Sequence, residues 1–277
     1  MIKPYETRDG AAMPRLGMGT WYMGERAATR AREIDALRLG LDLGLSLIDT
    51  AEMYGDGDSE ALVGEAIQGR RDEVFLVTKV LPHNASAKGT IEACERSLRL
   101  LGTDRIDLFL LHWQGPHRLE DTFAAFERLK AAGKIRHHGV SNFDAEDMAE
   151  AEAVGGGAGI ADQVLYSLAS RGAERRLIPW CAERGVAVMA YSPFYHGRMD
   201  VAAALDEVAG RHDVTPHAVA IAWTLRHENI ICIPKAANPD HIRANAAALD
   251  LALTDEDLAA LDAAYPAPAR DVPLDIL

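Results

Sequence analysis

Short apolar segments recur along the chain and alternate with longer amphipathic segments. Most of the apolar segments contain few polar residues, as expected for strands that are buried on both faces of a parallel sheet. The predicted strands are Leu45–Ile48, Val74–Thr78, Ile106–Leu111, Ile135–Val140, Ile160–Leu165, Val186–Ala190 and Ile230–Ile233. Met18–Trp21 is a weaker additional strand near the start of the chain.

The segments between these strands have the period of amphipathic helices. In two of them the apolar residues fall three or four positions apart, on one helical face. These residues are Ile91, Cys94, Leu98 and Leu101 in the first segment, and Leu119, Phe123, Phe126 and Leu129 in the second. Thr215 followed by Pro216 predicts a helix start, since threonine caps helices and proline suits the first helical position. Asp240 and Thr254 are the expected caps of two later helices.

Strands that alternate with helices over residues 1–277 predict one domain with the α/β fold of a (β/α)8 TIM barrel. A doubly wound parallel sheet is the alternative that periodicity leaves open. In barrel enzymes the chemistry lies at the carboxyl ends of the strands. The polar residues that end each predicted strand are therefore the candidates for function.

Several predicted strands end in a polar side chain. These residues are Asp49, Lys79, His112, Ser141, Asn142 and Gln163, and Tyr54 follows Asp49 by five positions. Taken alone, a histidine is usually structural and a lysine is usually solvated. Burying an acid, a lysine and a histidine together is costly unless they pair with one another. We therefore expect Asp49, Tyr54, Lys79 and His112 to form one cluster.

Such a cluster suits the reduction of a carbonyl group. The carbonyl oxygen gains negative charge when its carbon accepts hydride, so it needs a proton from a nearby acid. We expect Tyr54 to be that acid, with Lys79 lowering its pKa by about 1–3 units from an ordinary value near 10. Asp49 would keep the lysine charged, and His112 would hydrogen-bond the substrate oxygen. The hydride requires a cofactor, because no side chain supplies one.

Four segments combine these residues into longer motifs. They are Ile48–Gly55 (IDTAEMYG), Asp107–Trp113 (DLFLLHW), Gly139–Phe143 (GVSNF) and Ile233–Lys235 (IPK). In number, order and spacing they resemble the signatures of the aldo-keto reductase family along nearly the whole chain. The resemblance implies an NAD(P)H-dependent oxidoreductase with Asp49, Tyr54, Lys79 and His112 as its catalytic tetrad. Residues 19–25, 163–166 and 265–268 also resemble a bacterial branch that includes methylglyoxal reductases, which implies small aldehydes and ketones as substrates.

The resemblance also implies how a nicotinamide cofactor would be bound. Ser141, Asn142 and Gln163 would hydrogen-bond the nicotinamide amide, and Tyr191 would stack under the nicotinamide ring. Residues 192–194 would border the pyrophosphate, and Asn245 would lie near the adenine. The full set of implied cofactor contacts is Gly19, Thr20, Trp21, Ser141, Asn142, Gln163, Tyr191, Ser192, Pro193, Phe194, Ile233, Lys235, Ala236, His241 and Asn245.

The segment after Ile233 departs from the family pattern where relatives hold the cofactor's 2′-phosphate. Lys235 is kept, but Ala236 stands where a serine or threonine is usual, and His241 stands where an arginine is common. Arginine binds phosphate with two hydrogen bonds and keeps its charge, whereas histidine is mostly neutral above pH 7. Arg243 is a candidate substitute. We expect NADPH as the cofactor with weakened discrimination against NADH.

The predicted substrate pocket is open and suits small carbonyl compounds. The loops after His112 and Tyr191 are short, and only a dozen residues follow Tyr265. Trp21 is expected to line the pocket, and His83 and Trp113 are expected either to line it or to be rim residues without a role. His137 and His138 have no further ligand at metal-site spacing, so no metal site is expected.

Composition limits the partners and the compartment. The net charge of −13 disfavours binding to nucleic acid and to anionic membranes. The three cysteines lack a CxxC spacing, and the start of the chain has no signal-peptide pattern, so we expect a cytoplasmic protein. Family members are often monomeric, which predicts a monomer that binds a small-molecule carbonyl substrate.

Two other functions remain as alternatives at this level. Some relatives of this fold act as channel subunits, so a regulatory module that binds nicotinamide cofactor with little turnover is one alternative. A barrel isomerase or hydrolase without nicotinamide is the other.

Overall fold

The computed structural model describes residues 3–154, 159–195 and 203–276, and its centre is a barrel of eight parallel strands. The strands are β3 (Gly17–Gly19), β4 (Leu47–Asp49), β5 (Phe75–Val80), β6 (Ile106–Leu111), β7 (Ile135–Ser141), β8 (Ala161–Leu165), β9 (Ala187–Tyr191) and β10 (Ile230–Ile233). All seven strongly predicted strands are present, within a residue or two at either end. The weaker strand is shorter than predicted, since Thr20 and Trp21 lie beyond its end.

The strand order excludes the doubly wound sheet. Each strand pairs in parallel with its neighbours in the sequence, from β3 through to β10. Leu16 and Cys232 then form a parallel bridge, and the Cys232 amide donates to the Arg15 carbonyl at 2.9 Å. The sheet therefore closes on itself, whereas a doubly wound sheet stays open and reverses its order.

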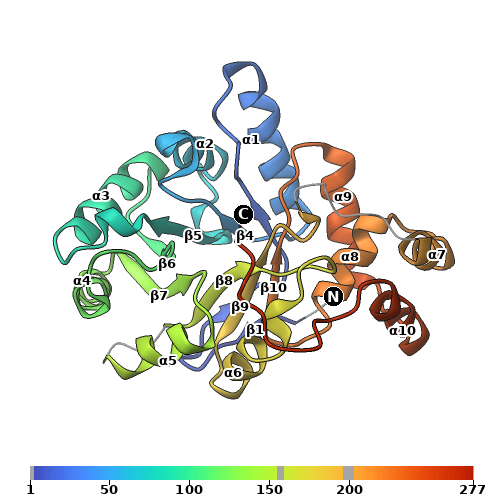
Figure 1. Ribbon diagram of the computed structural model, residues 1–277. Coiled ribbons are helices and arrows are strands. Elements are labelled where there is room, and N and C mark those ends of the chain that lie inside the picture. The colour runs from blue at the N-terminus through green and yellow to red at the C-terminus, as the bar shows by residue number, and fades with distance from the viewer. Residues whose placement is uncertain (1–2, 155–158, 196–202, 277) are drawn as a thin grey trace.

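Helices surround the barrel, as Figure 1 shows. They are α1 (Ala27–Asp42), α2 (Asp58–Ala66), α3 (Gly89–Leu101), α4 (Leu119–Ala131), α5 (Ala145–Ala153), α6 (Leu177–Glu183), α7 (Ala203–Arg211), α8 (Pro216–Thr224), α9 (Pro239–Ala247) and α10 (Asp255–Ala264). The predicted apolar faces of α3 and α4 turn inward and join the buried layer between helices and strands. Within the described residues no helix is long and apolar enough to cross a membrane.

The caps of the later helices follow from local sequence. Thr215 accepts a hydrogen bond from the Ala218 amide at the start of α8, and Thr254 forms a capping box with Asp257 at the start of α10. Asp240 does not cap α9, so that prediction is wrong. Asn238 is the cap instead, because Pro239 takes the first helical position, where its missing N–H costs nothing.

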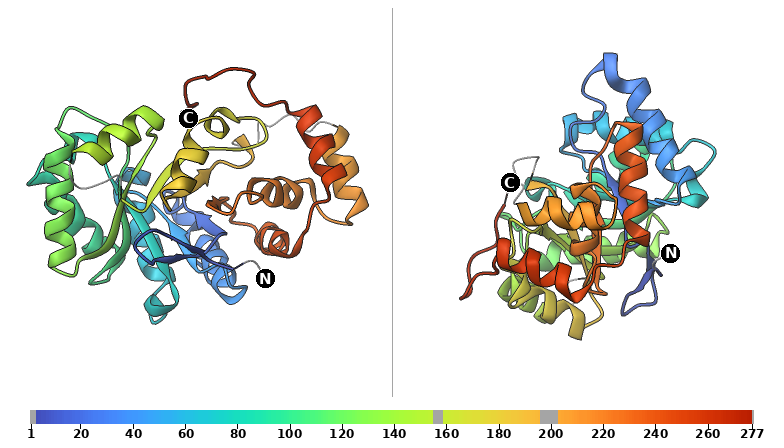
Figure 2. Two further views of the ribbon diagram at one scale, coloured as in Figure 1. Left: turned by 90° about the horizontal axis from the view of Figure 1, so that it is seen from below. Right: turned by 90° about the vertical axis from the view of Figure 1, so that its right-hand side faces the viewer.

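The barrel interior is a packed apolar core, not a channel. Its fully buried side chains come from alternate positions on the strands, and they include Leu47, Val77, Leu108, Met189 and Ile231. A short antiparallel hairpin, β1 (Tyr5–Glu6) with β2 (Ala12–Met13), adds Met13 to this core at the amino-terminal end of the barrel. Figure 2 shows the hairpin at the end of the barrel opposite the carboxyl-terminal tail. The other end is left open for a site.

Candidate active site

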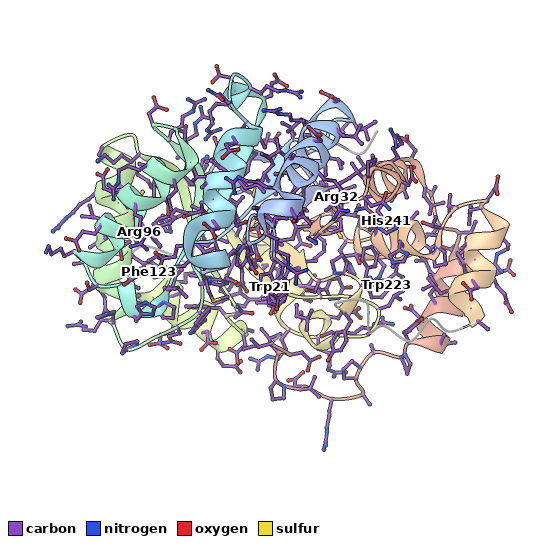
Figure 3. All side chains as sticks on the ribbon, turned by 90° about the horizontal axis from the view of Figure 1, so that it is seen from above. Trp21, Arg32, Arg96, Phe123, Trp223 and His241 are labelled. Atoms are coloured by element: carbon purple, nitrogen blue, oxygen red, sulfur yellow. The ribbon has the colours of Figure 1, made fainter. Side chains whose placement is uncertain are left out.

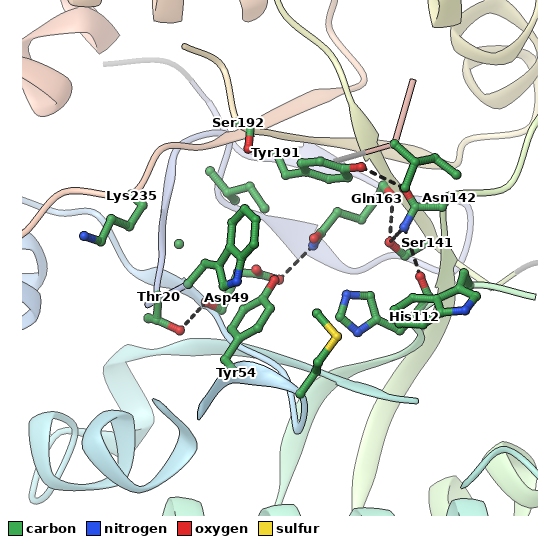
Figure 4. Close-up of a pocket in the computed structure, with 16 residues that line it drawn as sticks. Thr20, Asp49, Tyr54, His112, Ser141, Asn142, Gln163, Tyr191, Ser192 and Lys235 are labelled. Atoms are coloured by element: carbon green, nitrogen blue, oxygen red, sulfur yellow. Dashed lines mark hydrogen bonds between the residues drawn. The ribbon is translucent and has the colours of Figure 1, made fainter. Parts of the chain in front are cut away.

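A pocket opens at the carboxyl end of the barrel, where polar side chains from most of the strands converge (Figure 4). Its lining is Gly19, Thr20, Trp21, Asp49, Met53, Tyr54, His112, Trp113, Ser141, Asn142, Gln163, Tyr191, Ser192, Ile233, Lys235 and Ile276. The parallel pairing puts every strand's carboxyl end at this one rim, which brings residues together from points far apart in the sequence.

A buried ion pair forms the floor of the pocket. Lys79 is fully buried, and its Nζ donates to the two carboxylate oxygens of Asp49 at 2.8 and 2.9 Å and to the Thr50 carbonyl at 2.8 Å. Gln163 Nε2 donates to Asp49 Oδ1 at 2.7 Å. Burial lowers the pKa of Lys79, and the Asp49 charge opposes that shift. Because Lys79 has three acceptors here, the arrangement favours its charged form.

The phenol of Tyr54 lies above this pair. Lys79 Nζ is 3.4 Å from Tyr54 Oη, so the predicted lysine–tyrosine contact is present. Burial raises the pKa of Tyr54 well above 10, and the nearby Asp49 charge raises it further. The expectation that Lys79 lowers this pKa is therefore wrong for the protein alone. Asp49 neutralises most of the Lys79 charge, so the attraction between Lys79 and a phenolate is smaller than the cost of desolvating that phenolate.

His112 faces the same pocket from the end of β6. Its ring stands edge-on to the Tyr54 ring, with centroids 6.1 Å apart. Burial lowers the pKa of His112 well below 6.5, and the Lys79 charge acts in the same direction. His112 is therefore a neutral imidazole at neutral pH. Its buried Nδ1 has no hydrogen-bond partner among the described residues.

The ends of β7, β8 and β9 form a hydrogen-bonded polar wall. Ser141 Oγ donates to the Gln163 carbonyl at 2.8 Å, and Tyr191 Oη donates to Asn142 Oδ1 at 2.9 Å. Asn142 also donates to the His112 carbonyl at 3.1 Å, from a left-handed backbone conformation with φ of 60°. These contacts fix the side chains that the resemblance assigns to the nicotinamide amide.

The pocket continues as a groove toward α9. Lys235 lines the pocket and also two adjoining hollows, so the three meet at this residue. One hollow is lined by Phe194, Ala236, His241 and Asn245, among others. An extended groove with a polar wall at one end, aromatic rings along it and basic residues at the other end fits a nicotinamide dinucleotide with a 2′-phosphate. The predicted cofactor residues thus lie along one path, except that Pro193 is buried and outside these linings.

The predicted pocket residues are only partly brought together. Trp21 and Trp113 line the pocket, and Trp21 stacks on Tyr22 with centroids 4.6 Å apart. His83 is exposed and lies outside the lining, in a short 3-10 helix, Pro82–Asn84, beyond the end of β5. His83 is close to Lys79 in the sequence, but the 3-10 helix that follows β5 carries its side chain outside the pocket lining.

Several residues that line the pocket or the adjoining hollows were not predicted, and three of them matter for function. Met53 and Ile276 line the pocket, and Arg32 of α1 lines one of the adjoining hollows. Met53 directly precedes Tyr54, which was a usable signal. Ile276 and Arg32 had none, because only tertiary packing brings the carboxyl-terminal tail and α1 to the groove.

The histidines that raised the question of a metal have other contacts. His137 Nδ1 lies 2.8 Å from Asp9 Oδ2, and the His138 ring stacks on Phe126 with centroids 5.3 Å apart. In the described parts of the chain, no group of three or more His, Cys, Asp or Glu residues is placed to hold a metal ion.

Comparisons with known proteins agree with this geometry. The family model for the aldo/keto reductase family matches residues 15–266. The chain is 50% identical to methylglyoxal reductase YeaE of Escherichia coli K12 over 96% of each chain, and 29% identical to glyoxal reductase of Bacillus subtilis over 92% of this chain and 90% of that one. A crystal structure of an aldo/keto reductase from Klebsiella pneumoniae, in complex with NADP and acetate, superposes with a TM-score of 0.94 at 45% identity and covers 100% of both chains.

The motif order, the closed barrel and the assembled tetrad thus agree with a family model that spans most of the chain. Together they establish that this protein is a member of the aldo/keto reductase family.

Proposed function

We propose that this protein reduces small aldehydes and ketones to alcohols with NADPH, with Tyr54 as the proton donor. The observation that carries the proposal is the fully buried Lys79, bound to Asp49 and 3.4 Å from the Tyr54 hydroxyl, at the base of an open pocket. Burying a charged pair has a desolvation cost, so a buried pair beside a phenol in a pocket indicates a functional role.

Each tetrad residue has a distinct role in this proposal. Bound NADPH supplies hydride to the carbonyl carbon. Tyr54 donates its proton to the carbonyl oxygen, and the Lys79 ammonium stabilises the phenolate that remains. Asp49 keeps Lys79 charged, and His112 donates a hydrogen bond from its neutral ring to the same oxygen. A high Tyr54 pKa does not prevent this transfer, because an alkoxide is a stronger base than a phenolate.

The proposed substrates are small carbonyl compounds such as methylglyoxal. The relatives named as methylglyoxal reductase and glyoxal reductase support this class. The rings of Trp21 and Trp113 and the side chains of Met53 and Ile276 give the entrance an apolar wall, so an aromatic aldehyde is a second candidate.

We further propose that the cofactor is bound by the residues that the family resemblance assigned. The nicotinamide would lie against Ser141, Asn142 and Tyr191, and the adenine would lie near Asn245. The Gln163 amide nitrogen would remain hydrogen-bonded to Asp49, so only the Gln163 side-chain oxygen would be available to accept a hydrogen bond from the cofactor. The structural relatives in complex with NADP and with NADPH support the choice of cofactor.

The setting of the protein is also a proposal. Three buried cysteines without a disulfide support an enzyme of the cytoplasm, and the charge of −13 supports one that binds neither nucleic acid nor anionic membranes. The single eight-stranded barrel supports one domain, and the family resemblance supports a monomer.

The test is the rate of NADPH oxidation with methylglyoxal and with an aromatic aldehyde, for the wild type and for Tyr54→Phe. We expect Tyr54→Phe to lower kcat by about 10²- to 10⁴-fold, the usual contribution of a general acid. NADPH affinity, measured by fluorescence, should change by less than about twofold, since only a hydroxyl facing the substrate is lost. Tyr22→Phe is the matched control, because Tyr22 is 60% exposed and outside the pocket lining.

Near-normal turnover by Tyr54→Phe would contradict the assigned mechanism. Tight NADPH binding by the wild type, with no turnover on any of several aldehydes, would favour the regulatory module instead.

A further inference from the structure

One of the two hollows that adjoin the pocket lies between α1 and the start of α9. This hollow, which we call the basic end, is lined by Arg32, Lys235, Ala236, Ala237, Asn238 and His241. Figure 3 shows Arg32 on α1 beside His241 on α9. Two of these side chains carry a positive charge, and a third gains one on protonation, in a protein whose net charge is −13. Such a local excess of positive charge is typical of an anion site.

Arg32 differs from its neighbours on α1. Arg30 forms an ion pair with Glu65 at 2.7 Å, and Arg38 donates to the Glu65 carbonyl at 2.9 Å. Arg32 makes no hydrogen bond or ion pair with any residue in the described part of the chain, although it lines the hollow. Its guanidinium is therefore free to bind a ligand.

Apart from Lys235, the residues near the basic end do not provide a permanently charged phosphate ligand other than Arg32. Arg243, the substitute suggested by the sequence, is outside the lining and donates to Asp240 at 3.3 Å. Ala236 has no hydroxyl to offer. The His241 ring stacks on His217, with centroids 6.2 Å apart and planes 13° apart. A histidine is neutral or charged near pH 7, whereas a guanidinium keeps its charge.

We propose that Arg32 binds the 2′-phosphate of NADPH together with Lys235, and that it sets the preference for NADPH over NADH. The inference rests on the proposed function, because it assumes that the groove holds a nicotinamide dinucleotide. Arg32 on α1 would thus bind the phosphate in place of the arginine that the family pattern commonly has at the position of His241. Its planar fork forms two charge-assisted hydrogen bonds to one phosphate.

The test is the dissociation constant of NADPH, NADH and 2′,5′-ADP, measured by titration calorimetry on the purified protein without substrate. We expect Arg32→Ala to raise the dissociation constants of NADPH and 2′,5′-ADP by about 10- to 100-fold, the range for loss of a charged hydrogen-bond donor. The NADH constant should change by less than about twofold, since NADH has no 2′-phosphate. Arg32→Lys should recover only part of the loss, because a lysine cannot form the two parallel bonds.

Arg30→Ala is the matched control, because it removes an arginine two positions away on the same helix that is already paired with Glu65. It should leave all three constants unchanged. Arg32→Ala/His241→Arg should regain NADPH affinity, since an arginine then faces the hollow from α9.

The inference is overturned if Arg32→Ala weakens the binding of NADPH and of NADH equally. It is also overturned if the variant binds both as the wild type does, while the wild type binds NADPH tightly. Failure of the wild type to bind NADPH, NADH and 2′,5′-ADP would instead overturn the proposed function. The two failures are therefore distinguishable in one set of titrations.

Discussion

Tyr54 keeps its proton because the pocket gives a phenolate little solvation. Its pKa is raised by burial first and by Asp49 second, and Lys79 does not reverse the shift. A folded-state pKa above the ordinary value means that Tyr54 stays a phenol at neutral pH and well into the alkaline range. The reductive direction needs the phenol, whereas alcohol oxidation needs the phenolate as a base.

The two directions should therefore respond to pH in opposite ways. We expect kcat for carbonyl reduction to show no fall attributable to Tyr54 below about pH 10, the ordinary phenol value. The kcat for alcohol oxidation should rise steadily with pH over the same range, as the phenolate fraction grows. Steady-state kinetics in both directions from pH 6 to pH 10 test this. A reductive kcat that falls near pH 8 in the wild type would mean that bound ligands lower the Tyr54 pKa by more than burial raises it.

At the residue scale, the sequence predicted those pocket residues that directly follow a predicted strand. Asp49, Lys79 and His112 directly end apolar segments, and a barrel gathers such ends at one rim. The direction of the Tyr54 pKa was not predictable, because it depends on how completely the phenol is buried. Arg32 was equally hidden, since an arginine on a polar helix face is normally only solvated.

The strand pairing depends on a close approach between β7 and β8. Val140 pairs with Asp162 and Ser141 pairs with Gln163, which sets the relative height of the polar wall. Gly139 lies one position earlier, where an added Cβ would be 2.3 Å from the Ala161 carbonyl oxygen. Because that neighbour is backbone, it cannot move aside without shifting β8.

Gly139→Ala should therefore destabilise the protein by about 1–3 kcal/mol, the usual cost of overpacking a core. Gly210→Ala is the matched control, because Gly210 lies in α7 with nothing within 4 Å of its added Cβ. That variant should be as stable as the wild type or slightly more stable, since alanine favours helix. Urea unfolding of both variants measures the difference. Equal stability of the two would show that β8 adapts to the extra methyl group.

The elements themselves were largely predictable, because short apolar strands and amphipathic helices have recognisable sequence patterns. The hairpin β1–β2 was not predicted. Its strands have two residues each, which is too short for any periodicity to appear. Asp240 is not a cap because Pro239 takes the first helical position of α9, as Pro216 does in α8, which places the cap one residue earlier at Asn238.

At the scale of the whole molecule, the tail after α10 returns across the mouth of the barrel (Figure 1). Arg175 donates to Asp271 at 3.2 Å and to the Ala269 carbonyl at 3.2 Å, and Ser170 donates to Asp275 at 2.7 Å. These contacts bring Ile276 to the pocket, where its side chain is 65% exposed. A bound substrate could therefore bury part of its apolar surface. The sequence predicted a short tail and an open pocket, but it gave no sign of this path.

Ile276→Ala should raise KM for an aromatic aldehyde by about 3- to 10-fold, as expected for losing part of an apolar contact. The NADPH affinity should stay unchanged, because Ile276 lies at the substrate entrance and not among the residues that line the groove toward α9. Val272→Ala is the matched control, since Val272 is an apolar tail residue, 40% exposed, that lies beside Gly172 and not in the pocket.

Ser170→Ala tests whether the tail must be tied down for Ile276 to act. With the bond to Asp275 removed, KM for the aromatic aldehyde should rise in the same direction as in Ile276→Ala, and the double variant should be little worse than either single one. Methylglyoxal has a single methyl group beside its two carbonyl groups and little apolar surface to place against Ile276, so its KM should hardly change in any of these variants. If all three variants raised KM for both substrates equally, the tail would be acting on the fold of the site and not on the apolar part of the substrate.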